Sequence, residues 1–371
     1  MSRVLVLNSG SSSVKYRLFD GASTVAKGLV ERIGESGGEV PDHRAALQGI
    51  MDEADLTGLA AVGHRVVHGG PDFTGPTVIN DQVVAQVEAL VPLAPLHNPA
   101  ALTGIEVARK LLPDVPQVAV FDTAFHATIP PEGVTWAISR ELAERWQIRR
   151  YGFHGTSHAY VSRRTAHVLG RDPASTNVIT LHLGNGASAC AVEGGRSVAT
   201  SMGMSPLPGL VMGTRSGDID PTVIFHLHRV AGLPLDEIET SLTRHAGLLG
   251  LTGANDLRTV LERRAAGDAD ATLAFDVYCR RIREYVGAYL AVLGRVDAIT
   301  FTAGVGENAP AVRTAALAGL EPLGIEIDPD RNERREEIIS PPGARIPVCV
   351  IPTDEELEIA DQSRTALSLP R

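Results

Sequence analysis

Residues 4–19 read VLVLNSGSSSVKYRLF, and this stretch decides the fold. The apolar run Val4–Leu7 predicts a buried strand, which the polar, glycine-containing segment 8–13 ends. Val14–Phe19 predicts a second strand and Thr24–Ile33 a third. The chain therefore opens with a strand, a polar loop, a strand, a turn and a strand.

The same order of elements recurs in the second half of the chain. Asn177–Leu183 predicts a strand, Gly184-Asn185-Gly186 a turn, and Ala187–Val192 a second strand. After the turn at 193–195, Arg196–Thr200 predicts a third strand. Because a long-period repeat changes the whole fold assignment, we take an internal duplication as a hypothesis.

Helical and strand patterns alternate along the rest of the chain, which is typical of an α/β fold. Residues 201–220 contain Gly, Pro and Met and are expected to form a long irregular segment. Loops of this length are usually functional or disordered, and the apolar residues here argue against disorder. We expect strands over 61–67, 117–121, 298–302 and 347–351, and helices over 44–54, 81–90, 99–111, 220–230, 236–245, 256–264, 268–293 and 355–367.

The composition excludes several classes of protein. The 371 residues carry 34 cationic and 44 acidic side chains, a net charge of −10, which argues against nucleic-acid and membrane partners. Three distant cysteines without a CxxC pair predict a reducing compartment and no disulfide framework. No apolar run approaches the ~18 residues of a membrane span. The first apolar run, Val4–Leu7, is also too short for the core of a signal peptide. We therefore expect a cytoplasmic protein.

Three loops at strand ends are suited to bind phosphate. Segment 8–13 offers hydroxyls and backbone N–H groups, with Lys15 just beyond, and the glycines of 184–186 permit close approach of a ligand. Residues 304–308 lie between a strand and a predicted helix, where free amides favour an anion. Each loop alone is more often a plain turn. Together they favour a nucleotide-phosphate site.

Histidines, arginines and acids gather in other short segments. Arg65 ends a strand and Asp122 follows one, where ligands of α/β sheets collect. His154 and His158 have the i, i+4 spacing of metal ligands but no third ligand nearby, and His64 and His68 could simply be packed structural residues. The acids of 353–356 are either ordinary helix N-terminal acids or include a Mg²⁺ ligand.

Taken together, these segments resemble the acetate kinase family, within the sugar kinase, Hsp70 and actin fold group. The resemblance covers almost the whole chain and implies two duplicated ribonuclease-H-like α/β domains with a cleft between them, one formed by 1–122 plus 355–371 and the other, nucleotide-binding, by 123–354. The segments that carry it are VLVLNSGSSSVK (4–15), GHRVVHGG (63–70), PLHNP (95–99), VFDTAFH (120–126), RRYGFHGTSH (149–158), HLGNG (182–186), GTRSGDIDP (213–221), FTAGVGEN (301–308) and IPTDEEL (351–357).

The resemblance also implies roles for individual residues. It implies catalytic roles for Arg65, Asp122, His154 and Arg215, with His154 and Arg215 stabilising the transition state. The implied substrate-binding residues are Arg65, Val67, Leu96, His97, Phe153 and Pro206, and the implied metal ligands are Asn8 and Glu355. The implied ATP-binding residues are Ser13, Lys15, His182, Gly184, Asn185, Gly186, Asp256, Leu257, Arg258, Gly304, Val305, Gly306 and Asn308.

The implied activity is reversible transfer of the ATP γ-phosphoryl group to acetate, with Mg²⁺ (or Mn²⁺) as cofactor, ATP and ADP as co-substrates, and a homodimer. The chemistry agrees, because a carboxylate is already ionised at pH 7 and needs no general base. Two arginines, a histidine and Mg²⁺ would relieve the repulsion between two anions. One departure is Thr252-Gly253-Ala254-Asn255, where the family usually has SGxS. A propionate kinase and a non-catalytic ATP-dependent switch of the actin or Hsp70 type remain alternatives.

Overall fold

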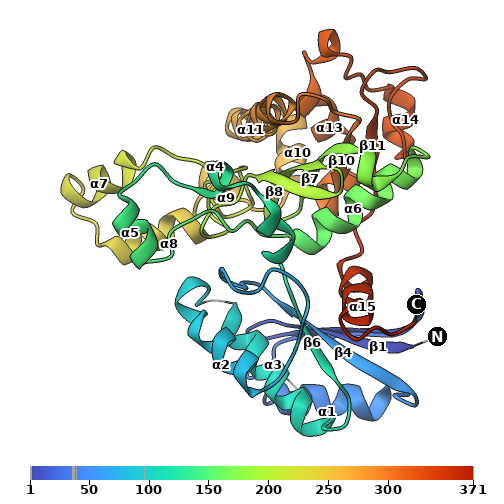
Figure 1. Cartoon of the computed structure of the whole chain (residues 1–371). Helices are drawn as coiled ribbons and strands as arrows, with labels where there is room; N and C mark the ends of the chain where they lie inside the picture. Colours follow the sequence, from blue (N-terminus) through green and yellow to red (C-terminus); the bar gives the residue numbers. More distant parts are fainter. Residues whose placement is uncertain (1, 36–37, 39, 96, 371) are drawn as a thin grey trace. The chain divides into compact units, whose positions relative to one another are not determined.

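The computed structural model describes residues 2–35, 38, 40–95 and 97–370, which form two compact units (Figure 1). The first consists of Met1–Ala127, Phe153–Ser157 and Asp354–Arg371, and the second of Thr128–Gly152 and His158–Thr353. The short segment Phe153–Ser157 thus belongs to the first unit, whereas the predicted domain boundaries assign it to the second. The boundaries of the two domains stay a prediction.

The described part of the first unit contains a six-stranded mixed sheet in the order β3-β2-β1-β4-β6-β5. Strands β2 and β3 run antiparallel to their neighbours, while β1, β4 and β6 are parallel to one another. The strands are β1 (Arg3–Ser9), β2 (Val14–Asp20), β3 (Ser23–Val30), β4 (Leu59–Val66), β5 (Thr77–Val78) and β6 (Gln117–Phe121).

The second unit repeats this topology in its own five-stranded sheet, ordered β11-β10-β7-β8-β9 in the described residues. Strands β7, β8 and β9 are antiparallel, and β7, β10 and β11 are parallel. The strands are β7 (Asn177–Leu183), β8 (Ala187–Glu193), β9 (Arg196–Thr200), β10 (Ala298–Thr302) and β11 (Val348–Val350). Because strands β7–β11 match β1–β4 and β6 in order and direction, the duplication predicted from the sequence is confirmed.

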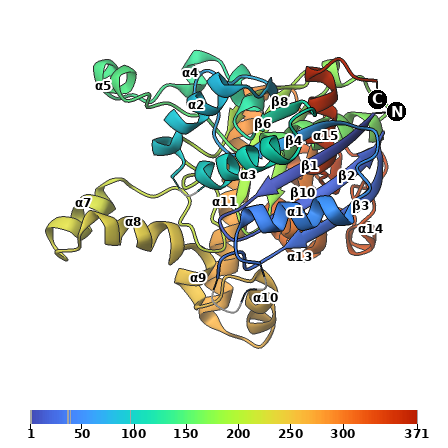
Figure 2. The same cartoon turned by 90° about the horizontal axis from the view of Figure 1, so that it is seen from below.

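The alternation along β1 explains why the first sheet is buried on both faces. Leu5 and Leu7 pack with helices α1 and α3, which lie side by side along one face (Figure 2). Val4 and Val6 point the other way and pack with Ile359 of the C-terminal helix α15. Successive strand residues point to opposite faces, so a run of four apolar residues builds two cores.

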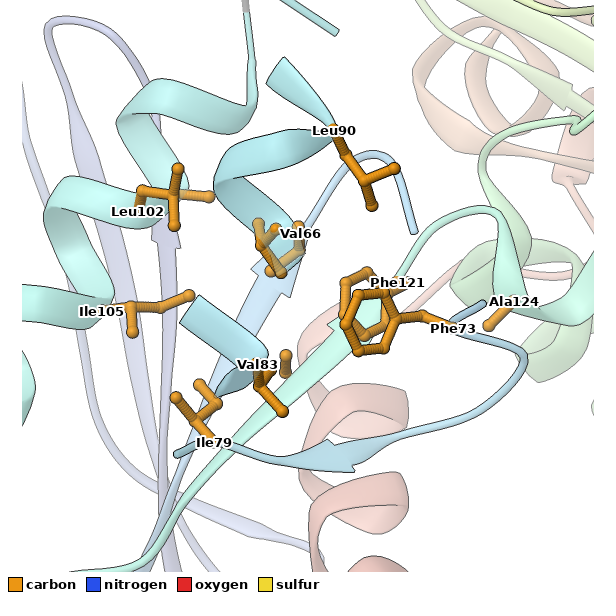
Figure 3. Packing of buried hydrophobic residues seen from close by; sticks show 12 residues of the cluster. Val66, Phe73, Ile79, Val83, Leu90, Leu102, Ile105, Phe121 and Ala124 are labelled. Carbon is orange, nitrogen blue, oxygen red and sulfur yellow. The ribbon is translucent and has the colours of Figure 1, made fainter. Parts of the chain in front are cut away.

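A third apolar cluster holds the carboxyl ends of β4 and β6 (Figure 3). Val66 and Phe121 end these strands and are buried, and Phe121 stacks on Phe73 with a ring separation of 4.5 Å. Ile105 of α3 completes the contact. This packing fixes the point at which Asp122 leaves the sheet.

Most helix boundaries lie within one or two residues of those predicted, and Asp42, Asp256, Asp268 and Asp354 cap helices through their side chains. The α-helices are α1 (His43–Glu53), α2 (Asp81–Ala89), α3 (Asn98–Leu111), α4 (Pro131–Val134), α5 (Arg140–Arg145), α6 (Gly155–Val168), α7 (Thr222–Arg229), α8 (Leu235–Arg244), α9 (Gly247–Thr252), α10 (Leu257–Ala265), α11 (Ala269–Leu293), α12 (Ala303–Asn308), α13 (Pro310–Leu317), α14 (Pro329–Arg334) and α15 (Glu355–Ala366). Short 3₁₀ helices are η1 (Val91–Leu93), η2 (Ala124–Thr128), η3 (Pro173–Ser175) and η4 (Glu321–Leu323).

Two elements differ from the sequence-based expectation. The polar segment after residue 153 begins helix α6, whose His158 contacts hydroxyl groups of β7 and β8. The predicted loop 304–308 is itself the short helix α12, because the Glu307 carboxylate accepts the Ala303 N–H at 2.8 Å and closes a helical turn. Among the described residues, no helix has the length and apolar character needed to cross a membrane.

Candidate functional site

In the first unit, the carboxyl ends of three neighbouring parallel strands gather the predicted polar residues. Asn8 lies near the end of β1, Arg65 is the penultimate residue of β4, and Asp122 follows β6. The register places Arg65 opposite Val120, so Asp122 lies two residues further along the neighbouring chain segment. Strand order β1-β4-β6 therefore brings the three residues to one edge of one sheet.

Arg65 and Asp122 form a two-bond ion pair. Arg65 donates from Nε to Oδ1 at 3.0 Å and from Nη2 to Oδ2 at 2.7 Å. Burial raises the pKa of Asp122, and the Arg65 guanidinium opposes that rise. Burial also disfavours the Arg65 cation, but the Asp122 and Glu355 carboxylates together raise its pKa. The pair is a fixed, charged fork at the strand ends.

The N-terminus of α15 brings acids to the same sheet. The Glu355 Oε2 atom lies 4.0 Å from Arg65 Nε, Glu356 forms an ion pair with Lys15, and Asp354 accepts two hydrogen bonds from Arg17 at 2.8 and 2.9 Å. Lys15 is therefore neutralised by Glu356, and Glu355 approaches the catalytic candidate Arg65. The oxygen side chains of Asn8 and Glu355 are the hard donors that Mg²⁺ prefers.

His154 is held in a strained conformation beside Asp122. Its φ of 57° lies in the left-handed region that non-glycine residues rarely adopt. On one side of His154, the Phe153 carbonyl lies 2.9 Å from His126 Nε2, and on the other the Gly155 N–H donates to the Asp122 carbonyl at 2.9 Å. These bonds impose the strain, which is the kind that clusters at functional sites.

The residues predicted to form the substrate pocket are divided between the two units. Phe153 is buried and packs edge-on against His68 with a ring separation of 5.5 Å. Val67 is half-buried directly after β4, and His97 occupies the N-cap position of α3. Leu96 lies outside the described residues, and Pro206 belongs to the second unit. The apolar acyl pocket stays a prediction.

The second unit contains a pocket of about 270 Å³ where its sheet and helices meet. Five predicted nucleotide residues line it, namely Gly184, Asn185, Asp256, Leu257 and Val305. Four further residues line it that sequence reasoning did not assign, namely Gly213, Leu248, Asn255 and Tyr278. Gly213 stood inside a quoted motif, but nothing in the sequence marked Leu248 or Tyr278, which reach the pocket only through helix packing.

Other predicted nucleotide residues lie around this pocket without lining it. Gly186 accepts the Gly184 N–H at 3.0 Å, and Asn308 donates to the Gly304 carbonyl at 2.8 Å. Arg258 pairs with Asp256 beside the pocket, and Gly306 is buried in α12. His182 is buried on β7, whereas Ser13 and Lys15 belong to the first unit. Nucleotide contacts of these residues stay predictions.

Arg215 lies on the irregular segment next to this pocket. Two residues before it, the Gly213 N–H donates to the Asn185 carbonyl at 2.9 Å, which joins the two loops. Arg215 Nη1 donates to the Pro206 carbonyl at 2.7 Å, and burial lowers its pKa with no acidic neighbour contributing. In the part of the chain that the structure describes, no carboxylate forms an ion pair with Arg215. It is a half-buried cation available to an anion.

Within the described residues, histidine and acid clusters elsewhere do not form a metal centre. His158 Nδ1 lies 2.7 Å from the Thr180 hydroxyl and Nε2 lies 2.8 Å from the Ser188 hydroxyl, so both of its nitrogens contact β7 and β8. No group of three or more His, Cys, Asp or Glu side chains with metal-ligand geometry occurs among the described residues. This is compatible with Mg²⁺ bound by one or two protein ligands and substrate phosphates.

Comparisons with known proteins agree on one family. The family model described as the Acetokinase family matches residues 3–361. An acetate kinase of Streptomyces avermitilis is 58% identical, covering 98% of this chain and 96% of the relative. The crystal structure of Porphyromonas gingivalis acetate kinase superposes with a TM-score of 0.94 at 42% identity, covering 99% of this chain and 100% of that one. A propionate kinase from Francisella tularensis superposes with a TM-score of 0.93 at 40% identity, covering 98% and 100%.

Proposed function

Since this chain belongs to the Acetokinase family, we propose that it catalyses reversible phosphoryl transfer between ATP and acetate. A carboxylate oxygen of acetate attacks the γ-phosphorus, the bond from that phosphorus to the β-phosphate oxygen breaks, and ADP leaves with the bond electrons. No proton moves, so no general base is required. The chain is an enzyme rather than a non-catalytic switch.

The observation that carries this proposal is the position of Arg215. Arg215 is half-buried and has no acidic partner among the described residues. It follows Gly213 by two residues, and Gly213 lines the proposed nucleotide pocket. A cation placed beside a nucleotide site can offset the charge that develops on the transferring phosphoryl group. We assign this role to Arg215 and His154.

The acetate carboxylate is assigned to Arg65 and His97 of the first unit. Arg65 is already oriented by the two hydrogen bonds that it donates to Asp122. Its remaining donors form no further hydrogen bond among the described residues, so they can bind an anion in a fixed plane. Asp122 holds this guanidinium and keeps the local charge balanced. The strand-end geometry therefore binds the acceptor without a mobile side chain.

Asn8 and Glu355 are proposed as ligands of a divalent cation, Mg²⁺ or Mn²⁺. When bound, the cation would offset negative charge on the β- and γ-phosphoryl oxygens. Glu355 is half-buried and belongs to the same unit as Asn8, and both offer oxygen donors. Glu356 is paired with Lys15, whereas Glu355 Oε2 lies 4.0 Å from Arg65 Nε.

Propionate is a second candidate substrate, favoured by the similarity to a propionate kinase. The two acids differ by one methylene, which an apolar pocket distinguishes by only ~1–3 kcal/mol. Val67, Leu96, Phe153 and Pro206 are the proposed walls of that pocket. We expect acetate to be the better substrate and propionate a slower one.

A homodimer is proposed through helices α7 and α8. They form a hairpin that projects from the second unit, as Figures 1 and 2 illustrate. No residue of α7 is buried, and Phe225, Val230 and Leu235 are exposed by 55–71%. A second copy of the chain would cover these side chains. Light scattering should give twice the chain mass, and the variant Phe225→Asp should give one chain mass.

The direct test of the proposed function is product formation. The purified chain is incubated with ATP, Mg²⁺ and acetate, and acetyl phosphate is trapped with hydroxylamine while ADP is measured by a coupled assay. We expect one acyl hydroxamate per ADP, dependent on acetate. ADP release that is independent of any carboxylic acid would contradict the proposal.

A further inference from the structure

The irregular segment that carries Arg215 is clamped at its base. We use the name Arg215 loop for residues 209–218. The Asp218 N–H donates to the Gly209 carbonyl at 3.0 Å, and the Gly209 N–H donates to Asp218 Oδ1 at 2.8 Å. The two ends of the loop are thus joined by reciprocal bonds, one of which uses a charged acceptor.

Helix α11 holds this base from outside. Arg281 Nη1 donates to the Gly209 carbonyl at 3.2 Å and to the Asp218 carbonyl at 3.1 Å, so one guanidinium binds both ends of the loop. The Tyr285 hydroxyl, one helical turn later, donates to Asp218 Oδ2 at 2.6 Å. Each carboxylate oxygen of Asp218 therefore has its own partner.

The top of the loop has little freedom once its base is fixed. Gly217 has a φ of +68°, and a Cβ there would lie 2.5 Å from the Leu210 carbonyl oxygen. The Met212 N–H donates to the Arg215 carbonyl at 3.2 Å, and the Gly213 N–H donates to Asn185 at 2.9 Å. Movement at the base therefore reaches Arg215, whereas Gly213 stays bonded to Asn185 in the wall of the nucleotide pocket.

From these contacts we infer that Asp218 is a positioning residue, which fixes Arg215 through the loop base with Tyr285 and Arg281 as its partners. The inference rests on the proposed role of Arg215. Asp218 touches no substrate. Its carboxylate holds the apolar, glycine-containing Arg215 loop in one conformation. The Arg215 guanidinium is therefore in place before each turnover and does not have to move into position.

Two variants and one control test the inference. Asp218→Asn keeps an acceptor for Gly209 but removes the charge, and Tyr285→Phe removes only the hydroxyl that binds Oδ2. The control is Asp220→Asn, two residues further on, whose exposed carboxylate accepts the Thr222 N–H at 2.8 Å. If Asp218→Asn fails to fold, Tyr285→Phe carries the test.

For Asp218→Asn we expect kcat to fall about tenfold, as when one hydrogen bond to a charged group is lost. The KM for ATP should stay within about twofold, because the residues that line the pocket are unchanged. Tyr285→Phe should lower kcat about threefold, and Asp220→Asn should match the wild type. An unchanged kcat in both Asp218→Asn and Tyr285→Phe would overturn the inference.

A double variant separates positioning from general structural damage. In an Arg215→Ala background, Asp218→Asn should lower kcat by no more than about twofold, because the group that it positions is absent. A full tenfold loss in that background would show independent damage and overturn the inference. If Arg215→Ala alone keeps the wild-type kcat, the proposed role of Arg215 fails as well. If Arg215→Ala has a low kcat but Asp218→Asn keeps the wild-type kcat, only the positioning role of Asp218 is refuted.

Discussion

Arg65 and Asp122 face each other across two parallel strands, with Nε–Oδ1 and Nη2–Oδ2 separations of 3.0 and 2.7 Å. The Asp122 side chain is buried, while the Arg65 side chain is about one-fifth exposed. Nε and Nη2 of the guanidinium are thus held by a buried carboxylate, while part of the side chain stays accessible. This one-sided pairing turns a flexible arginine into an oriented binding group.

Replacing Arg65 in this ion pair should impair turnover. Arg65→Ala should lower kcat/KM for acetate by about 10²–10³, because a preorganised charge contact is lost, and Arg65→Lys should restore little of it. Steady-state kinetics with varied acetate measures both. The matched control is Arg3→Ala, which breaks an ion pair with Asp55 at the opposite end of β1. A similar loss in Arg3→Ala would show that disturbing the sheet, not the site, causes the defect.

A methyl group on Gly213 should close the nucleotide pocket. A Cβ at this position would overlap the side-chain oxygen of Asn185, which lines the same pocket. We expect Gly213→Ala to weaken ATP binding about tenfold, measured by titration calorimetry. Gly287→Ala on α11 is the control, because its Cβ would meet no atom within 4 Å. Equal affinities in the two variants would place the nucleotide elsewhere.

The proposed role of Val67 as a wall of the acyl pocket predicts a change in substrate preference. Val67→Ala removes two methyl groups, so the extra methylene of propionate gains space while acetate loses contact. The ratio of kcat/KM for propionate to that for acetate should rise by about tenfold, within the range of one methylene. If Val67 merely ends a buried strand, both acids should suffer alike, and an unchanged ratio would reject the pocket assignment.

His64 should make stability depend on pH. It is buried, its Nε2 lies 2.7 Å from Gln117 Oε1, and burial lowers its pKa from 6.5 to about 4. The unfolded chain therefore binds a proton between pH 6.5 and 4 that the folded chain does not, so stability is lost as the pH falls through this window. The slope from this one group is about 1.4 kcal/mol per pH unit.

Urea unfolding followed by circular dichroism at pH 7 and pH 5 measures this effect. Wild type should lose about 2 kcal/mol more than His64→Gln over this interval, since most of the interval lies inside the window. Comparing the two proteins cancels the titration of shared carboxylates. Parallel losses in wild type and variant would show that His64 is not the titrating group.

The sequence predicted the fold because two separate signals agreed. The runs that became β1 and β7 are short, apolar and followed by polar glycine-containing loops, and each loop is followed by a second strand. The order of strands within each sheet was not predicted, and the structure shows that it is the same in both halves. Helix α6 was missed because its first turn, Gly155–His158, is polar, and only the structure reveals hydroxyls of β7 and β8 that satisfy His158.

Site residues that belong to short sequence motifs could be predicted, whereas those that reach the site through helix packing could not. Arg65 and Asp122 stood in short motifs at strand ends, so their proximity followed from parallel pairing. Tyr278 lines the pocket from the middle of a long amphipathic helix, where its pattern is that of an ordinary core residue. The strain at His154 likewise arises from bonds made by its neighbours, which no local pattern encodes.

The central claim is that Arg215 acts on the transferring phosphoryl group and not on nucleotide binding. The most direct test is Arg215→Ala, with kcat for acyl phosphate formation and the dissociation constant of ATP measured on the same preparation. We predict that kcat falls by about 10²–10³ while the dissociation constant changes less than about threefold. A variant that turns over at the wild-type rate, or one that loses activity only because ATP no longer binds, would contradict the account.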